Sequence, residues 1–266
     1  MTESVRDPLV TLLTDFGNAD GYVGAMKGVI LSLCRRARLV DLGHEIAPGD
    51  LLQAALALEA AVPCFPPGTV HCAVVDPGVG SNRSGIVLVD ERGVLVGPDN
   101  GLLSLAAKRF CKCYRIEEAD LMGEKVSSTF HGRDVFAPVV GHLASGVAAE
   151  EFGPEVEVFE RLELPRVELR GTLVEGEVIH EDRFGNLTTN IEAEAIGIKD
   201  PSRTTVEIAG KRIETLRKAY CEVERGALVV LEGSLGRIEI AVRDGSAAER
   251  LGLESPRGTP VYLRRP

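Results

Sequence analysis

The sequence predicts an α/β protein: an N-terminal doubly wound domain with a mainly parallel sheet, followed by a smaller C-terminal domain of antiparallel β strands. In the first half of the chain, short apolar, β-branched runs alternate with helical patterns, and two of these runs end at an aspartate followed by glycine. From about residue 171 onward, short alternating segments separated by glycine and charged turns replace this pattern. We expect the boundary near Leu164–Pro165, giving domains of residues 1–164 and 165–266.

The overall composition limits what the chain can bind. With 44% hydrophobic and 26% charged residues, its 266 residues are typical of a globular protein, and the net charge of −10 argues against a nucleic-acid binder. The first residues lack the apolar segment of a secretory signal, and the apolar stretch Ala54–Val62 is too short to span a bilayer. We therefore expect a cytoplasmic protein that binds neither nucleic acid nor membranes.

The six cysteines form no C-x-x-C pair, so free thiols are expected rather than disulfides or a zinc site. No group of His, Asp and Glu has the spacing of metal ligands, and we expect no metal.

The N-terminal elements alternate between strand and helix up to a central strand. We expect strands at Leu9–Leu13, Leu39–Leu42 and Val70–Val75, a helix at Tyr22–Leu33, and a second helix that Asp50 caps and that runs through Ala61.

The strand Val70–Val75 is the one around which this domain is built, because its almost continuously apolar character suits burial on both faces of a parallel sheet. It ends at Asp76-Pro77-Gly78, where proline stops the strand and a carboxylate is held at its carboxyl end, the edge at which such sheets bind ligands. Arg83 brings a guanidinium into the same loop. An Asp-Pro-Gly turn is also a common way to end a strand, so the loop alone leaves its role open.

Two further features follow this loop. Ile86–Val89 and Val94–Val96 predict a hairpin, and Gly97–Gly101 is expected to cap a helix beginning near Leu102. An apolar helix is expected at Val135–Leu143, with His131 near its positive end, where a neutral imidazole suited to act as a base is favoured.

The C-terminal half predicts five strands, at Thr172–His180, Asn186–Ile191, Thr205–Ile208, Leu228–Leu231 and Gly236–Val242. Two turns between them carry polar groups, Asp182–Asn186 and Glu232–Gly236, and each is also compatible with ordinary turn chemistry.

Five stretches together resemble one family: L-T-D-F-G-x-x-D-G-Y-V-G from Leu13, G-T-V-H-x-x-V-V-D-P-G-V-G from Gly68, T-F-H-G-R-D-x-F-A-P from Thr129, D-R-F-G-N-L-x-T-N-I from Asp182, and G-S-x-G-x-x-E-I-A-V from Gly233. The sequence resembles the S-adenosylmethionine (SAM) hydrolases that form adenosine, the SAM hydroxide adenosyltransferases, which are related to the SAM-dependent fluorinase and chlorinase. The resemblance implies an α/β domain, a β-rich domain, SAM as substrate with no cofactor, and a homotrimer with the site between subunits.

The resemblance also implies the site residues. Asp76, Arg83 and His131 would be catalytic, and the substrate-binding residues would be Asp15, Asp20, Gly21, Tyr22, Pro77, Gly132, Asp182, Phe184, Asn186, Ser234, Leu235, Val242 and Asp244. Among these, Asp15 would hold the ribose diol, Asp182 the methionine amine and Ser234 the methionine carboxylate. Phe184, Asn186 and the backbone of residues 242–244 would contact adenine. Leu235 departs from the fluorinase, which has arginine there.

The same residues separate the hydrolases from the halogenases, which replace the D-P-G segment with a halide loop and carry tyrosine at the position of His131. Here Asp76, Arg83 and His131 are all present, which favours a hydrolase. A SAM or adenosine sensor that binds without turnover is the alternative from another class; it would need the same ribose and adenine contacts but not this set of three.

In the expected reaction, a water held opposite the sulfonium attacks C5′ of the ribose. Asp76 beside Arg83 is a weak base that would orient the water, whereas His131, with an ordinary pKa of about 6.5, would assist its deprotonation. The sequence leaves open which of the three residues accepts the proton.

Overall fold

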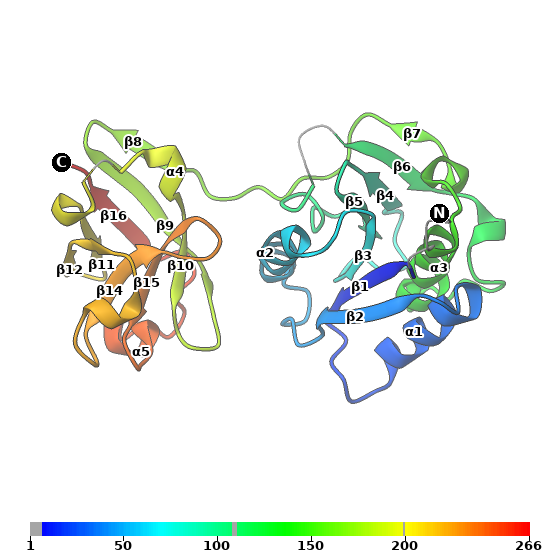
Figure 1. Cartoon of the computed structure of the whole chain (residues 1–266), viewed down its shortest axis with the longest axis horizontal. Coiled ribbons are helices and arrows are strands. Elements are labelled where there is room, and N and C mark those ends of the chain that lie inside the picture. The colour runs from blue at the N-terminus through cyan, green and yellow to red at the C-terminus, as the bar shows by residue number, and fades with distance from the viewer. Residues whose placement is uncertain (1–6, 108–110, 199) are drawn as a thin grey trace, which may run out of the picture. The chain divides into compact units, whose positions relative to one another are not determined.

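The computed structural model describes residues 7–107, 111–198 and 200–266 (Figure 1). The chain divides into two compact units, the first ending at Leu162 and the second beginning at Glu163. Each unit has its own hydrophobic core. The boundary expected from the sequence, Leu164–Pro165, lies in the first residues of the second unit.

The first unit is built on a seven-stranded sheet with the strand order β2-β1-β3-β5-β4-β6-β7. Its strands are β1 Leu9–Thr14, β2 Arg38–Gly43, β3 Thr69–Val74, β4 Gly85–Val89, β5 Gly93–Pro98, β6 Lys112–Ile116 and β7 Glu155–Val156. The four strands from β2 to β5 in this order are parallel, and β4, β6 and β7 continue the sheet by antiparallel pairing. This confirms the parallel-rich sheet, in which β3 is an internal strand between β1 and β5, and the β4–β5 hairpin.

Helices cover both faces of this sheet, as a doubly wound fold requires. α1 (Tyr22–Leu33) and α3 (Ala137–Ser145) pack on one face, against side chains such as Cys72 and Val74, and α2 (Leu51–Ala61) packs on the other with Ala73 and Val75 (Figure 1). Side chains on the two faces of β3 therefore contribute to different cores, which explains why the strand is buried at every position and mostly apolar.

The helix boundaries follow local signals in the sequence. α1 has the predicted bounds, and the side chain of Asp50 caps α2 by accepting a hydrogen bond from the backbone N–H of Gln53 at 3.0 Å. The part of the chain that the structure describes also contains six short helical turns: η1 Val62–Cys64, η2 Ala119–Leu121, η3 Gly132–Phe136, η4 Ala149–Phe152, η5 Pro201–Arg203 and η6 Tyr220–Glu222.

The prediction of a helix beginning near Leu102 is wrong for residues 101–107, which form turns. Residues 108–110 of this segment lie outside the described residues. Leu102 and Leu103 are both buried, so the segment turns two successive side chains into the core rather than presenting one helical face. The preceding Asn100 fixes this turn, because its side chain accepts from the N–H of Leu102 and donates to the carbonyl of Val75.

The second unit is a nine-stranded sheet with the path β12-β11-β16-β9-β10-β15-β14-β13, in which β8 also pairs with β9. Its strands are β8 Glu168–Arg170, β9 Leu173–Glu181, β10 Leu187–Glu192, β11 Thr205–Ile208, β12 Lys211–Glu214, β13 Leu216–Arg217, β14 Leu228–Glu232, β15 Arg237–Val242 and β16 Pro260–Arg264, with two short helices, α4 Ala193–Ile196 and α5 Ala247–Leu251. All pairs are antiparallel except β13 with β14. The five predicted strands are present, and the four others are short or rich in charge.

Among the described residues, every helix falls short of the length and apolar character needed to cross a membrane.

Candidate active site

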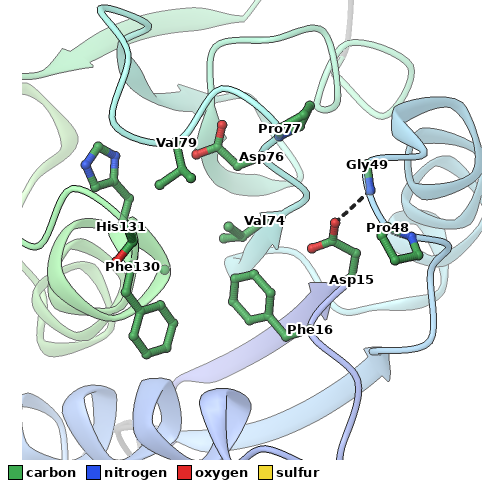
Figure 2. Close-up of a pocket in the computed structure, with 12 residues that line it drawn as sticks. Asp15, Phe16, Pro48, Gly49, Val74, Asp76, Pro77, Val79, Phe130 and His131 are labelled. Atoms are coloured by element: carbon green, nitrogen blue, oxygen red, sulfur yellow. Dashed lines mark hydrogen bonds between the residues drawn. The ribbon is translucent and has the colours of Figure 1, made fainter.

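A cavity of about 390 Å³ lies in the first unit, beside the segments that follow β1 and β3 (Figure 2). Twelve residues line it: Asp15, Phe16, Pro48, Gly49, Val74, Asp76, Pro77, Val79, Thr129, Phe130, His131 and Gly132. This is the edge of a parallel sheet at which ligands bind, and it brings together carboxylates from two neighbouring strands.

Asp15 comes directly after β1 and is held by the loop that leads into α2. Its Oδ2 atom accepts a hydrogen bond of 2.9 Å from the backbone N–H of Gly49, drawn as the dashed line in Figure 2. This is the one partner of the Asp15 carboxylate among the described residues, so Oδ1 is free to accept hydrogen bonds from a ligand.

Asp76 comes two residues after β3 and forms a buried ion pair with Arg83. The side chains are 4% and 11% exposed, respectively. Nε of Arg83 donates to Oδ1 at 2.9 Å and to Oδ2 at 3.0 Å, and Nη2 also donates to Oδ2. Two nitrogens of one guanidinium therefore fix the plane of the carboxylate.

His131 is joined to the same guanidinium. It stands at the start of η3, a turn of π-helix that leads into α3, and its Nδ1 lies 2.6 Å from Nη2 of Arg83. Arginine can only donate hydrogen bonds, so Nδ1 must be the unprotonated acceptor nitrogen. The imidazole is then the neutral tautomer that carries its proton on Nε2.

The surroundings of His131 favour this neutral form. Burial lowers the pKa of His131 from its ordinary 6.5, the charge of Arg83 lowers it further, and Asp76 and Asp134 oppose them. The sequence predicted a neutral His131 from its position at a helix end; in the structure, burial and the charge of Arg83 also favour the neutral form.

The loop that carries Asp76 and Arg83 packs closely on the loop before His131. A Cβ atom on Gly80 would lie 2.4 Å from the carbonyl oxygen of Ser128, and its φ of +77° favours glycine. The contact ties together two segments about 50 residues apart in sequence that both contribute to the Arg83 cluster.

Three of the expected substrate-binding residues lie beside the cavity rather than in its lining. Asp20 and Gly21 are exposed just before α1, and Tyr22 is 48% exposed. The ring of Tyr22 packs edge-on against the rings of two lining residues, Phe16 and Phe130, at 6.0 and 5.1 Å between centroids. Tyr22 thus extends the aromatic wall of the cavity.

The remaining expected residues lie in the second unit, around an open depression of about 1050 Å³. It is lined by Glu181, Asp182, Arg183, Phe184, Gly185, Asn186, Tyr220, Cys221, Ser234, Glu239, Val242, Arg243, Asp244, Gly245, Ser246 and Glu249. Six of the seven residues expected there from the sequence are in this lining; Leu235 is not.

Asp182 organises the turn between β9 and β10. Its Oδ1 accepts from the backbone N–H groups of Phe184 and Asn186, and its Oδ2 accepts from the side-chain amide of Asn186. These contacts leave the ring of Phe184 70% exposed at the rim of the depression.

Two family models match the chain in order. The SAM hydroxide adenosyltransferase N-terminal domain matches residues 10–153, and the SAM hydroxide adenosyltransferase C-terminal domain matches residues 176–258. The chain belongs to the SAM hydroxide adenosyltransferase family. This confirms the resemblance found in the sequence motifs.

Individual relatives agree with the family. A protein of Thermus thermophilus named (R)-S-adenosyl-L-methionine hydrolase is 42% identical over 263 residues, covering 96% of this chain and 98% of the relative. A fluorinase of Nocardia brasiliensis is more distant, at 27% identity over 79% of this chain and 80% of its own. A crystal structure of an uncharacterized conserved protein from Thermotoga maritima superposes with a TM-score of 0.88 at 34% identity, covering 96% of this chain and all of that one.

Several residues that line the first-unit cavity and the second-unit depression were not predicted from the sequence. Phe16, Gly49 and Phe130 line the first cavity, and the motif stretches that contain Phe16 and Phe130 were a usable signal. Tyr220 and Glu239 line the second depression. Glu239 could also have been identified from the sequence, because it is the one charged residue in the strand segment I-E-I-A-V.

Proposed function

We propose that the protein hydrolyses S-adenosyl-L-methionine to adenosine and L-methionine, by attack of a water molecule on the ribose C5′. The observation that carries the proposal is the Arg83 guanidinium, which holds both the Asp76 carboxylate and the His131 imidazole at one side of the cavity. The names of the relatives and the free Oδ1 of Asp15, positioned to accept from a ribose hydroxyl, support it.

The reaction makes limited chemical demands on the protein. The oxygen of water forms a bond to C5′ while the C5′–S bond breaks, and the bonding pair moves to the sulfonium, which leaves as a neutral thioether. Since the leaving group needs no acid, catalysis consists of placing one water in line with the C5′–S bond and removing its proton. Correct placement alone can contribute about 7–11 kcal/mol to lowering the barrier.

We propose that Asp76 orients the water and accepts its proton. Its plane is fixed by Arg83, and its oxygens retain acceptor capacity at the cavity. A strong base is not required for this step. As the new C–O bond forms, the attacking water becomes an oxonium, which is far more acidic than free water.

We propose that His131 acts mainly by positioning. Its lone pair at Nδ1 is engaged by Arg83, so accepting a proton from water at that nitrogen would require this hydrogen bond to break. The Nε2–H group is instead a donor that can hold the water oxygen. The base role expected for His131 from the sequence stays a prediction that the variants below distinguish from this one.

The first prediction concerns the products. Pure protein incubated with SAM in ¹⁸O-labelled water should form adenosine and methionine in equal amounts, with the label in the 5′-hydroxyl group of adenosine, as measured by mass spectrometry. Asp76→Asn should abolish this turnover, whereas Asp120→Asn, an exposed aspartate on η2, should leave it unchanged. Methylthioadenosine as product, or an unlabelled hydroxyl, would contradict the proposal. SAM binding without turnover would support a sensor instead.

The second prediction separates positioning from proton transfer at His131. His131→Ala should lower kcat about 100-fold with KM nearly unchanged, because the water site loses its alignment. His131→Asn offers an amide oxygen to Arg83 in place of Nδ1 and should recover most of that loss. If His131 is itself the base, Asn will be as slow as Ala.

The pH profile gives the matching test. The pKa of His131 lies below 6.5, so the parent rate should be flat from pH 7 upward and fall as the pH drops below that value. Protonation adds a positive charge beside Arg83 and removes the acceptor at Nδ1. In His131→Asn this acid limb should disappear or move to lower pH; an unchanged limb would show that another group causes it.

We further propose that the protein is a homotrimer in which the second-unit depression of one subunit completes the first-unit cavity of a neighbour. The expected ligands are divided between two hollows, one carrying Asp76 and His131 and the other Asp182 and Asn186. Sedimentation equilibrium should give a mass near three times the 28.5 kDa chain. A fully active monomer would contradict this arrangement.

A further inference from the structure

Glu239 is a buried carboxylate in the middle of a strand of the second unit. On β15, Ile238 and Ile240 point into the hydrophobic core, so Glu239 between them lies on the opposite face, where it lines the open depression. The residue is only 9% exposed, an uncommon environment for glutamate unless a partner compensates its charge.

One oxygen of this carboxylate accepts a hydrogen bond from the protein, and the other does not. The hydroxyl of Tyr220, on η6, donates to Oε1 at 2.6 Å. Burial, this hydrogen bond and the charge of Glu239 raise the pKa of Tyr220 to about 12, so the hydroxyl remains a donor. Among the described residues Oε2 has no hydrogen-bond partner and Glu239 forms no ion pair.

The backbone beside Oε2 leaves room for this oxygen. A Cβ atom on Gly233 would lie 2.8 Å from this oxygen, so any side chain there would crowd it. The next residue, Ser234, lines the same depression and is the residue expected to bind the methionine carboxylate. An amino acid carries its ammonium and carboxylate groups on one carbon, so their binding groups must be near each other.

Asp182, to which the family resemblance assigns the amine, is already committed to its own turn. Three N–H groups donate to it, two of them to Oδ1. Glu239 accepts from one hydroxyl only. The carboxylate with the larger free acceptor capacity is therefore Glu239.

The electrostatics of the depression favour a cation at Glu239. Burial raises the pKa of Glu239, and so does the charge of Asp182, while the Tyr220 hydrogen bond opposes them. Two basic side chains, Arg183 and Arg243, line the same depression. Arg243 directs its guanidinium to the carbonyls of Cys221 and Val223. Among the described residues, neither arginine forms an ion pair with Glu239. A bound ammonium group would compensate a charge that the described residues leave uncompensated.

We propose that Glu239, held in place by Tyr220, binds the α-ammonium group of the methionine moiety of SAM. This rests on the proposed function and names the residue that recognises the amino acid end of its substrate. Asp182 then serves mainly to fix the turn that presents Phe184 and Asn186.

The test is Glu239→Gln, which keeps the shape and the acceptor for Tyr220 but removes the charge. For SAM, KM and the calorimetric Kd should rise about 10- to 100-fold, the size expected for a hydrogen bond to a charged group, with kcat little changed. Glu207→Gln, at an exposed glutamate on β11 that is not part of the lining of the depression, is the matched control and should leave both constants unchanged.

A SAM analogue with hydrogen in place of the α-amino group makes the assignment specific. The parent should bind it more weakly than SAM, whereas Glu239→Gln should bind the two alike. Tyr220→Phe keeps the carboxylate but frees it to move, and should weaken SAM binding less than Glu239→Gln does. Melting temperatures of each variant check that the unit still folds.

The outcomes separate this inference from the proposed function. If the parent hydrolyses SAM and Glu239→Gln binds SAM equally well, or still prefers SAM to the analogue, Glu239 is structural and the inference is overturned while the function stands. If the parent binds SAM without turnover and Glu239→Gln loses that binding, the inference stands and hydrolysis does not. A parent that neither binds nor hydrolyses SAM overturns both.

Discussion

The buried guanidinium of Arg83 is the group on which the proposed chemistry of this protein depends. Taking a guanidinium and a carboxylate out of water is costly, and only good geometry with several hydrogen bonds offsets that cost. Here Arg83 meets Asp76 through two nitrogens, donates to the carbonyl of Ser84 and to His131, and lies 5.3 Å from the centre of the Phe136 ring. Removing one member of such a buried pair typically costs about 3–5 kcal/mol of folding stability. The several hydrogen bonds to one planar guanidinium also keep Asp76, Arg83 and His131 in fixed positions relative to one another.

This rigidity has a direct consequence for the direction of each hydrogen bond. Because arginine only donates, it fixes Asp76 as charged acceptor and His131 as neutral acceptor at Nδ1. In the proposed mechanism the water faces a carboxylate that can accept and an Nε2–H group that can donate. That division suits a displacement at a sulfonium, in which the nucleophile must be placed accurately while the leaving group needs no help. In the proposed function the second depression recognises the substrate; there the Asp182 carboxylate is bound into its turn, and one oxygen of Glu239 has no hydrogen-bond partner among the described residues.

Much of this architecture could be predicted from the sequence because local signals and burial agree there. The apolar strand ending at Asp76, the Asp50 cap and the alternating strands of the second unit each have a direct physical signature. The segment after Leu102 misled because its apolar residues turn into the core instead of following one helical face. The hydrogen bond between Arg83 and His131 could not be predicted from the sequence, because it joins two loops that meet only in the folded chain. These loops meet where Gly80 lies close to Ser128. Glu239 was visible as a lone charge in an apolar strand, but its significance required knowing that Tyr220 holds one oxygen and that Gly233 exposes the other.

The tautomer of His131 is the most direct measure of this account. Nitrogen-15 NMR of histidine-labelled protein at pH 7.5, with the five histidines distinguished by comparison with His131→Asn, reports which ring nitrogen carries the proton. The account predicts an unprotonated Nδ1 that accepts from Arg83, a protonated Nε2, and loss of this signature when Arg83 is replaced by methionine. A His131 protonated on Nδ1, or doubly protonated at this pH, would contradict the assignment of Asp76 as proton acceptor and His131 as positioning residue.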